Sequence, residues 1–158
     1  MVYESRLIRR FENLFKNCMH QVQESLDYET LASRLNLLAA VRAFGAHISF
    51  SESGESLVQI SDIKDIHTGG MESRAVNGMV LMGLLDSAIC AVSIARLKGR
   101  RCATVEMSTR FIKPVSSNVV LATGRVVSRS GNLLYCEASI VNKRGRPLVQ
   151  AFGLVHAI

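Results

Sequence analysis

The stretch VNGMVLMGLLDSAICAVSIA, residues 76–95, is the feature that most constrains the fold of this chain. Apolar side chains occupy nearly every position, so a helix formed here has to be buried on almost every side. A sheet covers only one side of such a helix, so we expect a curved sheet that wraps it and a second copy of the chain that covers the remainder. One carboxylate, Asp86, lies in the middle of the stretch, and burying a charge is unfavourable unless something compensates it. Asp86 is therefore the first candidate for a functional residue.

The length and composition favour one folded domain. The chain has 158 residues, of which 48% are hydrophobic, enough for a core of its own. The N-terminal segment MVYESRLIRRFENLF is charged throughout and contains neither the apolar segment nor the cleavage site of a secretory signal. The longest apolar run, from Met79 to Ala95, is short for a membrane span and contains Asp86. We therefore expect a cytoplasmic protein that does not bind a membrane.

The net charge of the chain is consistent with a negatively charged partner but does not identify it. A net charge of +6 and a pI near 9.5 suit either nucleic acid or a small molecule with phosphate groups. The basic residues are spread along the chain, only 6% of residues are aromatic, and no nucleic-acid-binding motif is present. These features favour a phosphorylated small molecule over nucleic acid. A basic surface that only keeps the protein in solution remains the alternative.

The four cysteines give no sign of a metal or disulfide site. Cys18, Cys90, Cys102 and Cys136 form no CxxC pair, and none has a histidine at metal-ligand spacing. We interpret them as buried, reduced thiols and expect neither a metal nor a redox cofactor.

The hydrophobic period changes several times along the chain and so predicts the order of the elements. Helical spacing predicts an N-terminal helical extension over residues 1–40, with one helix over 4–23 and another from 28 to about 40. Residues 41–158 then form one α+β domain, in which the apolar helix ends near Gly99 after a loop over 65–76. The expected strands cover residues 43–50, 56–63, 104–112, 119–127, 133–141 and 148–156. Alternation in the strand over 104–112 places four side chains on one face: Val105, Met107, Thr109 and Phe111.

Three blocks of this sequence resemble the motifs of one family. Asn77-Gly78-Met79, with Asp86 and Ala88 further along, resembles the HGG-x-x-x-x-L-x-D-x-A block of the PaaI-like acyl-CoA thioesterases. Residues 104–115 resemble the family's T-x-x-L-x-x-x-F-L-R-P-V strand, and residues 126–134 resemble its VV-x-R-x-G-x-x-L turn. The blocks follow the family's order over about residues 44–155. The chain therefore resembles the hotdog-fold superfamily, in which a curved antiparallel sheet of about six strands wraps a long central helix.

The resemblance has two departures within its first block. Asn77 stands where the family has His, and Met79 stands where it has a second Gly. Asparagine keeps a side-chain donor but lacks the chemistry of an imidazole. The N-terminal helices lie outside the resemblance.

The resemblance implies hydrolysis of the thioester bond of an acyl-coenzyme A, without a cofactor beyond the coenzyme A of the substrate. Gly78 begins the helix, so its backbone N–H is a candidate oxyanion hole, although a simple helix-start glycine is the alternative. Asp86 is the expected general base or nucleophile, and a structural carboxylate held by backbone or arginine is the alternative. Eight residues of helix separate the two groups by ~12 Å, so one helix cannot bring both to one thioester. Two helices side by side can, and the resemblance implies such a shared site in a homodimer or a dimer of dimers.

Other residues are candidates for supporting roles. Asn77 either holds the carbonyl or the water, or it only caps the helix. Thr104 matches the position where the family has a Ser or Thr hydroxyl facing the site, and an ordinary strand threonine is the alternative. The candidates for substrate binding are one loop histidine, two helix methionines, three basic residues and two turn residues, namely His67, Met79, Met82, Arg110, Lys113, Arg129, Ser130 and Gly131. For each basic residue, solvated surface charge is the alternative to a contact with phosphate.

A non-catalytic module that binds acyl-CoA as sensor or carrier is the main alternative function. The change from His to Asn77 favours it, whereas Asp86 argues against it, because a binding module has no need for a buried acid. A nucleic-acid-binding role has only the net charge in its favour. The sequence does not define the acyl group, since Met79, Met82 and Phe111 suit aliphatic and aromatic chains alike.

Overall fold

The computed structural model describes residues 27–70 and 73–158, so the helix expected over 4–23 lies outside the described residues. The described part contains a 3-10 helix, η1 (Asp65–His67), besides its α-helices and strands. The helices are α2 (Tyr28–Asn36), α3 (Ala39–Ala43) and α4 (Gly78–Arg96). The strands are β1 (Ala46–Phe50), β2 (Ser56–Ile60), β3 (Thr68–Gly70), β4 (Ser73–Val76), β5 (Cys102–Phe111), β6 (Val120–Ser130), β7 (Leu133–Val141) and β8 (Pro147–Ala157).

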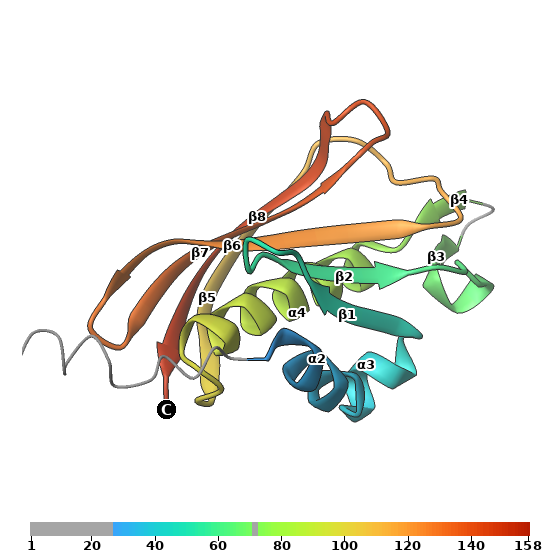
Figure 1. Ribbon diagram of the computed structural model, residues 1–158. Coiled ribbons are helices and arrows are strands. Elements are labelled where there is room, and N and C mark those ends of the chain that lie inside the picture. Colours follow the sequence, from blue (N-terminus) through green and yellow to red (C-terminus); the bar gives the residue numbers. More distant parts are fainter. Residues whose placement is uncertain (1–26, 71–72) are drawn as a thin grey trace, which may run out of the picture.

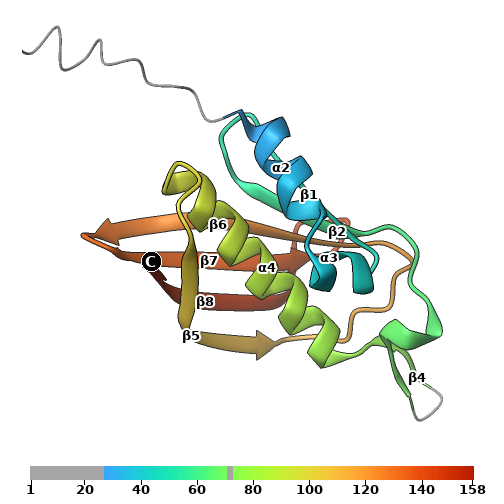
Figure 2. The ribbon, with the colours of Figure 1, turned by 90° about the horizontal axis from the view of Figure 1, so that it is seen from below.

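Six of these strands form one antiparallel sheet in the order β1-β2-β6-β7-β8-β5. The long helix α4 lies against one face of this sheet and crosses several of its strands (Figures 1 and 2). The strands β6, β7 and β8 are long and bend around the helix, and each carries a register shift where it pairs with a neighbour. The predicted α+β architecture, a long central helix wrapped by a six-stranded antiparallel sheet, is confirmed.

Both ends of α4 are set by local sequence. Asn77 caps the first turn, and the helix ends at the C-cap Leu97. Lys98 and Gly99 then adopt left-handed backbone angles, with φ of 55° and 82°, and the Gly99 N–H donates to the Ile94 carbonyl. This left-handed ending is the reason that the Gly99 signal predicted the end of the helix correctly.

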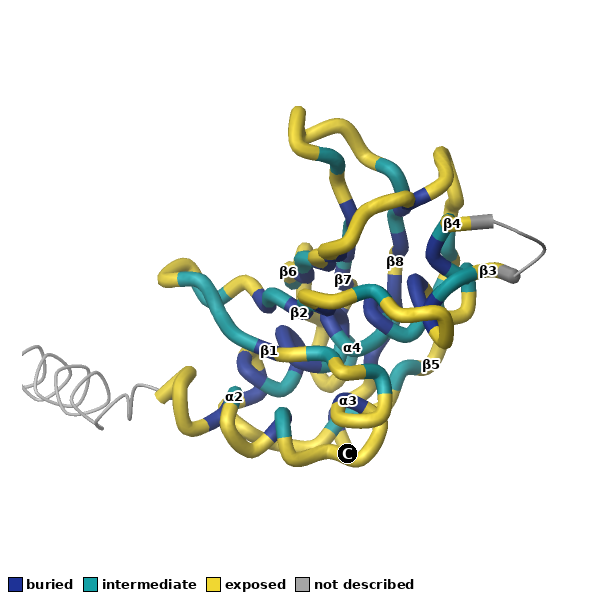
Figure 3. Tube along the Cα trace, turned by 90° about the vertical axis from the view of Figure 1, so that its right-hand side faces the viewer, coloured by how far each residue is buried: buried dark blue, intermediate teal, exposed yellow. Residues whose placement is uncertain are grey.

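Within one chain, α4 is left open on one face, as expected for a helix that a sheet covers from one side. Most of its side chains are buried against the sheet, but Met79, Met82, Asp86 and Cys90 are exposed or half-buried. Their spacing of three or four residues places them on one side of the helix. We call these four residues the open stripe of α4. Within one chain, therefore, the helix is not buried all round, and the buried positions gather where α4 and the sheet meet (Figure 3).

The length and hydropathy of α4 would also allow it to cross a membrane. Among the helices of residues 27–70 and 73–158, this is the one that meets both conditions. Of its most apolar window, 56% is buried inside the fold, so α4 serves here as the core helix of the sheet.

Two parts of the chain differ from their predicted elements. The helix expected over 28–40 is divided into α2 and α3, since Leu37 and Leu38 leave the helix between them. The predicted loop over 65–76 contains η1 and the small β3–β4 hairpin. Buried leucines of α2 and Val41 of α3 join the same core cluster as α4. The division between residues 1–40 and 41–158 stays a prediction.

Two small residues let α4 approach the sheet closely. A side chain at Gly124 of β6 would come within 2.7 Å of the Ala88 carbonyl oxygen and 2.6 Å of the Ser56 hydroxyl. The buried Ser56 hydroxyl donates to that same Ala88 carbonyl at 2.7 Å. Gly124 and Ser56 thus fix the height of α4 over the sheet at the turn of helix that carries Asp86.

Replacement of Gly124 by alanine is expected to lower the free energy of unfolding by about 2 kcal/mol or more, because backbone atoms block the space for the added methyl group. Chemical denaturation followed by circular dichroism measures this difference. Gly83→Ala is the matched control, since its methyl group would meet the Phe44 ring at an ordinary 3.6 Å and alanine favours the helix. Equal stability of Gly124→Ala and the unmodified protein would contradict the close approach.

Candidate active site

The start of α4 is built from Asn77 and Gly78. The Asn77 side-chain oxygen accepts a hydrogen bond from the Met79 N–H at 2.9 Å, which is the geometry of a helix cap. The backbone N–H of Asn77 donates to the His67 carbonyl at 2.8 Å, which connects the start of the helix to η1. The Asn77 amide nitrogen donates to no group in the part of the chain that the structure describes. The capping role is thus present, and a contact with the reacting groups stays a prediction.

Gly78 is the first residue of α4, where backbone N–H groups have no partner within the helix. The Phe111 ring lies beside it, with two ring carbons 3.4 Å from the position of an added Cβ. A side chain at this position would therefore lie in tight contact with the ring. Because Gly78 has no side chain, nothing of Gly78 beyond its own backbone hinders a carbonyl oxygen that approaches its N–H.

Asp86 and Thr104 meet between α4 and β5. The Thr104 hydroxyl donates to Oδ1 of Asp86 at 2.7 Å, and both residues are half-buried. The other carboxylate oxygen, Oδ2, has no hydrogen-bond partner among the described residues, and no basic side chain of that part pairs with Asp86. One oxygen is thus fixed by the neighbouring strand, while the other is free to take a proton or to attack.

A bulge in β5 aims Thr104 at the helix. Thr104 pairs with Val155 of β8, but the next pair joins Glu106 to Leu154, so Val105 is an extra residue in the strand. The bulge reverses the alternation, so that Thr104 lies on the helix side of the strand together with Met107 beyond the bulge. Val105 is exposed for the same reason. The prediction that Val105 shares a face with Met107 was therefore wrong, and the bulge is the physical cause.

Two cysteines belong to this site, which the sequence analysis did not predict. Cys90 lies one helical turn after Asp86, and its Sγ is 3.2 Å from the Thr104 hydroxyl. Cys102, the first residue of β5, is next to it, with its Sγ 3.9 Å from the Cys90 carbonyl oxygen. A hydrogen bond from the Cys102 thiol, aided by Thr104, lowers the pKa of Cys90 below that of an ordinary thiol. The same hydrogen bond, aided by burial, raises the pKa of Cys102.

The spacing of Cys90 from Asp86 could have predicted its place in the site. Residues four apart on a helix are neighbours on one face. The absence of CxxC pairs could not reveal that Cys90 lies beside Asp86, because that motif indicates only metal and disulfide sites formed by cysteines close in sequence.

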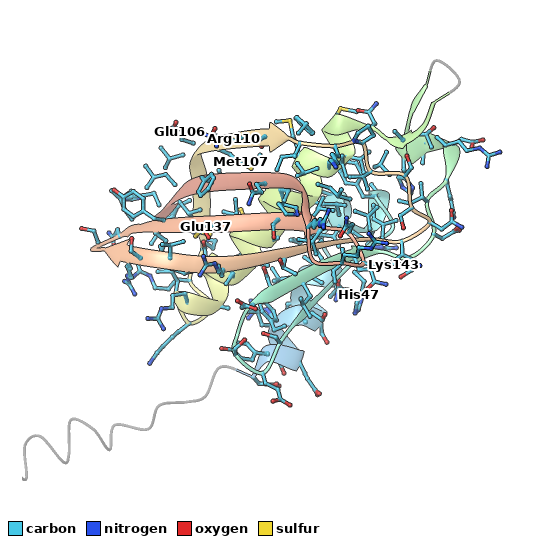
Figure 4. The ribbon with its side chains drawn as sticks, turned by 90° about the horizontal axis from the view of Figure 1, so that it is seen from above. His47, Glu106, Met107, Arg110, Glu137 and Lys143 are labelled. Carbon is cyan, nitrogen blue, oxygen red and sulfur yellow. The ribbon has the colours of Figure 1, made fainter. Side chains whose placement is uncertain are left out.

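The candidates for substrate binding are spread over four regions, the fourth being a cavity that Arg129 lines. Met79 and Met82 belong to the open stripe, with exposed fractions of 70% and 40%. His67 is buried at the end of η1, where its Nδ1 accepts the Lys64 N–H at 3.0 Å. Arg110 lies with Glu106 on β5, on the sheet face away from α4 (Figure 4), and Lys113 follows the end of that strand. Neither of these two basic residues is brought next to Asp86 within one chain.

Arg129 lines a cavity at the far end of α4. The cavity has a volume of about 650 Å³ and lies between the end of the helix, the end of β6 and the turn between β1 and β2. Arg129 is held by its Nε–H, which donates to the Gly131 carbonyl at 2.8 Å, and Ser130 lies between the two in the chain. Three further basic residues line the cavity, namely Arg96, Lys98 and Arg125. These three could not be identified from the sequence, because they come together only when α4 and β6 lie side by side.

No group of three or more His, Cys, Asp or Glu side chains in residues 27–70 and 73–158 is arranged to hold a metal ion. The half-buried acid, the hydroxyl and the free backbone N–H at a helix start are groups that polarise a carbonyl and activate water. The described residues of the site therefore offer acid–base and electrostatic chemistry.

Comparisons with known proteins agree with the fold. Residues 74–149 match the family model described as thioesterase superfamily, and this range includes Asn77, Gly78, Asp86 and Thr104. No curated protein matches the sequence.

Several solved structures share the fold. The PaaI protein from the phenylacetic acid degradation operon of E. coli has a TM-score of 0.67 and 20% identity, over 80% of this chain and 88% of its own. A thioesterase family protein from Silicibacter pomeroyi has a TM-score of 0.70 and 16% identity, over 81% and 95%. A phenylacetic acid degradation-related protein from Ralstonia eutropha JMP134 has a TM-score of 0.64 and 17% identity, over 83% and 100%.

The variant Asn77→Ala is expected to lower the free energy of unfolding by about 1 kcal/mol, because the Met79 N–H loses its capping partner. Thermal and chemical denaturation measure the loss. Asn77→Ser is the matched control, since a serine oxygen caps the same N–H and keeps most of the stability. If the alanine and serine variants were equally stable, the cap would have no energetic role.

Proposed function

This chain resembles the PaaI-like thioesterases of the hotdog-fold superfamily, and we propose that it hydrolyses the thioester bond of an acyl-coenzyme A. The products are a free carboxylic acid and coenzyme A. The observation that carries the proposal is the Asp86 carboxylate, held by the Thr104 hydroxyl on a helix that is otherwise mostly buried.

The arrangement of Asp86 and Thr104 suits the activation of water. Thr104 fixes Oδ1, so Oδ2 can take the proton of a water molecule as that water attacks the thioester carbonyl. Asp86 can alternatively attack the carbonyl itself, so that the C–S bond breaks, the coenzyme A thiolate leaves and an anhydride forms, which water then cleaves. In both routes the carboxylate has to face the substrate, and its place on the open stripe of α4 supports this.

The oxyanion of the reaction needs a donor that Asp86's own helix does not supply. Gly78 of the same chain begins the helix ~12 Å away along its axis, which is too far for both groups to touch one carbonyl. In our proposal the Gly78 N–H comes from a second copy of the chain, with Asn77 beside it. Each copy then contributes Gly78 to one site and Asp86 to the other.

The edge of the sheet supports this homodimer. Strand β5 is the last in the sheet order, so one of its sides has no partner strand among the described residues. Three apolar side chains at this edge are exposed, namely Val105, Phe111 and Ile112. Exposed apolar surface and an unpaired strand edge favour pairing with another chain. Pairing of two β5 edges would bring the two copies of α4 side by side, with their open stripes facing the same interface.

Basic side chains are proposed to bind the phosphate groups of coenzyme A. Arginine and lysine suit phosphate because they combine charge with several N–H donors. The cavity lined by Arg96, Lys98 and Arg129 has this character, with Ser130 and Gly131 in the adjoining turn. Arg110 and Lys113 on and after β5 are the second set, and His67, Met79 and Met82 near the helix start are proposed to contact the acyl part.

The variant Asp86→Asn is expected to lower the turnover of acyl-CoA by about 10²- to 10⁴-fold, because the amide cannot take the proton of the attacking water. A thiol-reactive dye follows the release of coenzyme A over a panel of acyl chains, and gel filtration checks that the oligomer is intact. Asp62→Asn is the matched control, since this carboxylate is 80% exposed and lies outside the site, so turnover should not change.

Unchanged turnover in Asp86→Asn would contradict the role of the acid. Tight binding of acyl-CoA without release of thiol by the unmodified protein would instead support the non-catalytic binding module.

A further inference from the structure

We propose that Cys90 is an oxidation site, with Cys102 as its resolving partner, and that a disulfide between them reversibly disables the site at Asp86. The two thiols and the Thr104 hydroxyl form one connected group beside the carboxylate. The effect on turnover depends on the proposed thioesterase function, whereas the formation of the disulfide does not.

The hydrogen bonds around Thr104 indicate that the Cys90 thiol acts as a hydrogen-bond donor. The Thr104 hydroxyl has one proton, and it donates that proton to Asp86 at 2.7 Å. The contact of 3.2 Å between Thr104 and Cys90 is then made by the Cys90 thiol as donor. Cys90 therefore fixes the hydroxyl that in turn fixes the carboxylate, so Cys90 acts as a positioning residue.

Cys90 also has the environment of a reactive thiol. Thiolates, not thiols, are the nucleophiles of cysteine chemistry, and neighbouring donors favour them. The hydrogen bond from the Cys102 thiol is the main cause that holds the pKa of Cys90 below the ordinary value, and the contact with Thr104 contributes to it. Cys90 and Cys102 are both half-buried, and the open stripe that contains Cys90 is the face that a substrate has to reach. A reagent as small as hydrogen peroxide can reach the same place.

Cys136 is different from this pair. It is fully buried, hydrogen-bonded to Ser93 at 3.3 Å, and burial raises its pKa. The chain thus contains a matched control thiol that should not react.

The oxidation takes place in two steps with hydrogen peroxide as the oxidant. The Cys90 thiolate attacks one peroxide oxygen, so an S–O bond forms, the O–O bond breaks, and hydroxide leaves as the sulfur becomes a sulfenic acid. The Cys102 sulfur then attacks the Cys90 sulfur, so the S–S bond forms and the S–O bond breaks. The Cys102 proton leaves with the departing hydroxide as water. In sum, two thiols and one hydrogen peroxide give one disulfide and two waters.

The disulfide would disturb the catalytic pair directly. The Cys90 sulfur turns from Thr104 toward Cys102 and no longer carries a proton to donate. Thr104 then loses the donor that orients its hydroxyl, and Asp86 loses a fixed partner. We expect turnover to fall by about tenfold or more, because small displacements of catalytic groups have effects of this size.

Peptide mapping under non-reducing conditions tests the disulfide in the full-length protein. Trypsin releases Cys90 and Cys102 on separate peptides, since Arg96, Lys98, Arg100 and Arg101 lie between them. After hydrogen peroxide treatment, mass spectrometry should find the two peptides linked in chains that run as monomers on a non-reducing gel. Cys136→Ser should give the same link, and Cys102→Ser should instead give a sulfenic acid at Cys90 that dimedone traps. Absence of the link, or a link found only between chains, would overturn the proposal.

A parallel turnover assay tests the consequence. Peroxide should lower acyl-CoA turnover in the unmodified protein and in Cys136→Ser, and dithiothreitol should restore it. In Cys102→Ser the loss should become irreversible, because no resolving thiol protects Cys90 from further oxidation. A disulfide that forms without a change in turnover would overturn the regulatory part. If the reduced protein released no thiol from any acyl-CoA, the proposed thioesterase function would fail, while the peptide map would still decide the oxidation site.

Discussion

The hydrogen bond from Thr104 to Asp86 is the interaction on which the candidate site depends. A carboxylate on a core helix is unfavourable unless polar groups compensate it. Thr104 provides that compensation from the edge strand β5, and it does so because a bulge at Val105 reverses the alternation of the strand. The same bulge leaves Met107 packed against the core beyond it. One extra residue in β5 thus allows Met107 to pack against the core and Thr104 to reach Asp86.

The hydrogen bond between Thr104 and Asp86 also depends on the position of α4 over the sheet. Ser56 donates to the Ala88 carbonyl, and Gly124 leaves room for that carbonyl to approach the strand. Ala88 lies two residues after Asp86, so the height of the helix at this turn also sets the depth of the acid. The glycine and the serine belong to β6 and β2, far from the site in sequence. The geometry of the candidate site therefore depends on strands that lie far from it in the sequence.

Much of the fold could be predicted from the sequence, because the signals involved are local. The apolar run predicted α4, Gly99 predicted its end, and period-two patterns with short turns predicted the six strands of the main sheet. The bulge at Val105 could not be predicted, since it depends on how β5 pairs with β8 and not on the residues of β5 alone. The β3–β4 hairpin was missed because its strands are very short. For the site, the family motif indicated Asp86, Gly78, Asn77 and Thr104, whereas the contact of Cys90 with Thr104 required the helix and strand to be placed together.

Subunit complementation tests most directly whether Asp86 and Gly78 of different copies make one site. Gly78→Pro removes the backbone N–H at the first helical position, where proline is well tolerated. Gly78→Ala keeps the N–H but adds a side chain, so it separates the effect of the lost N–H from that of the added bulk. Gly78→Pro and Asp86→Asn should each be nearly inactive alone. Their mixed dimers should contain one site with both groups intact, so refolding equal amounts together should give about one quarter of the unmodified turnover. A mixture no more active than the two variants measured separately would contradict a site shared between two copies.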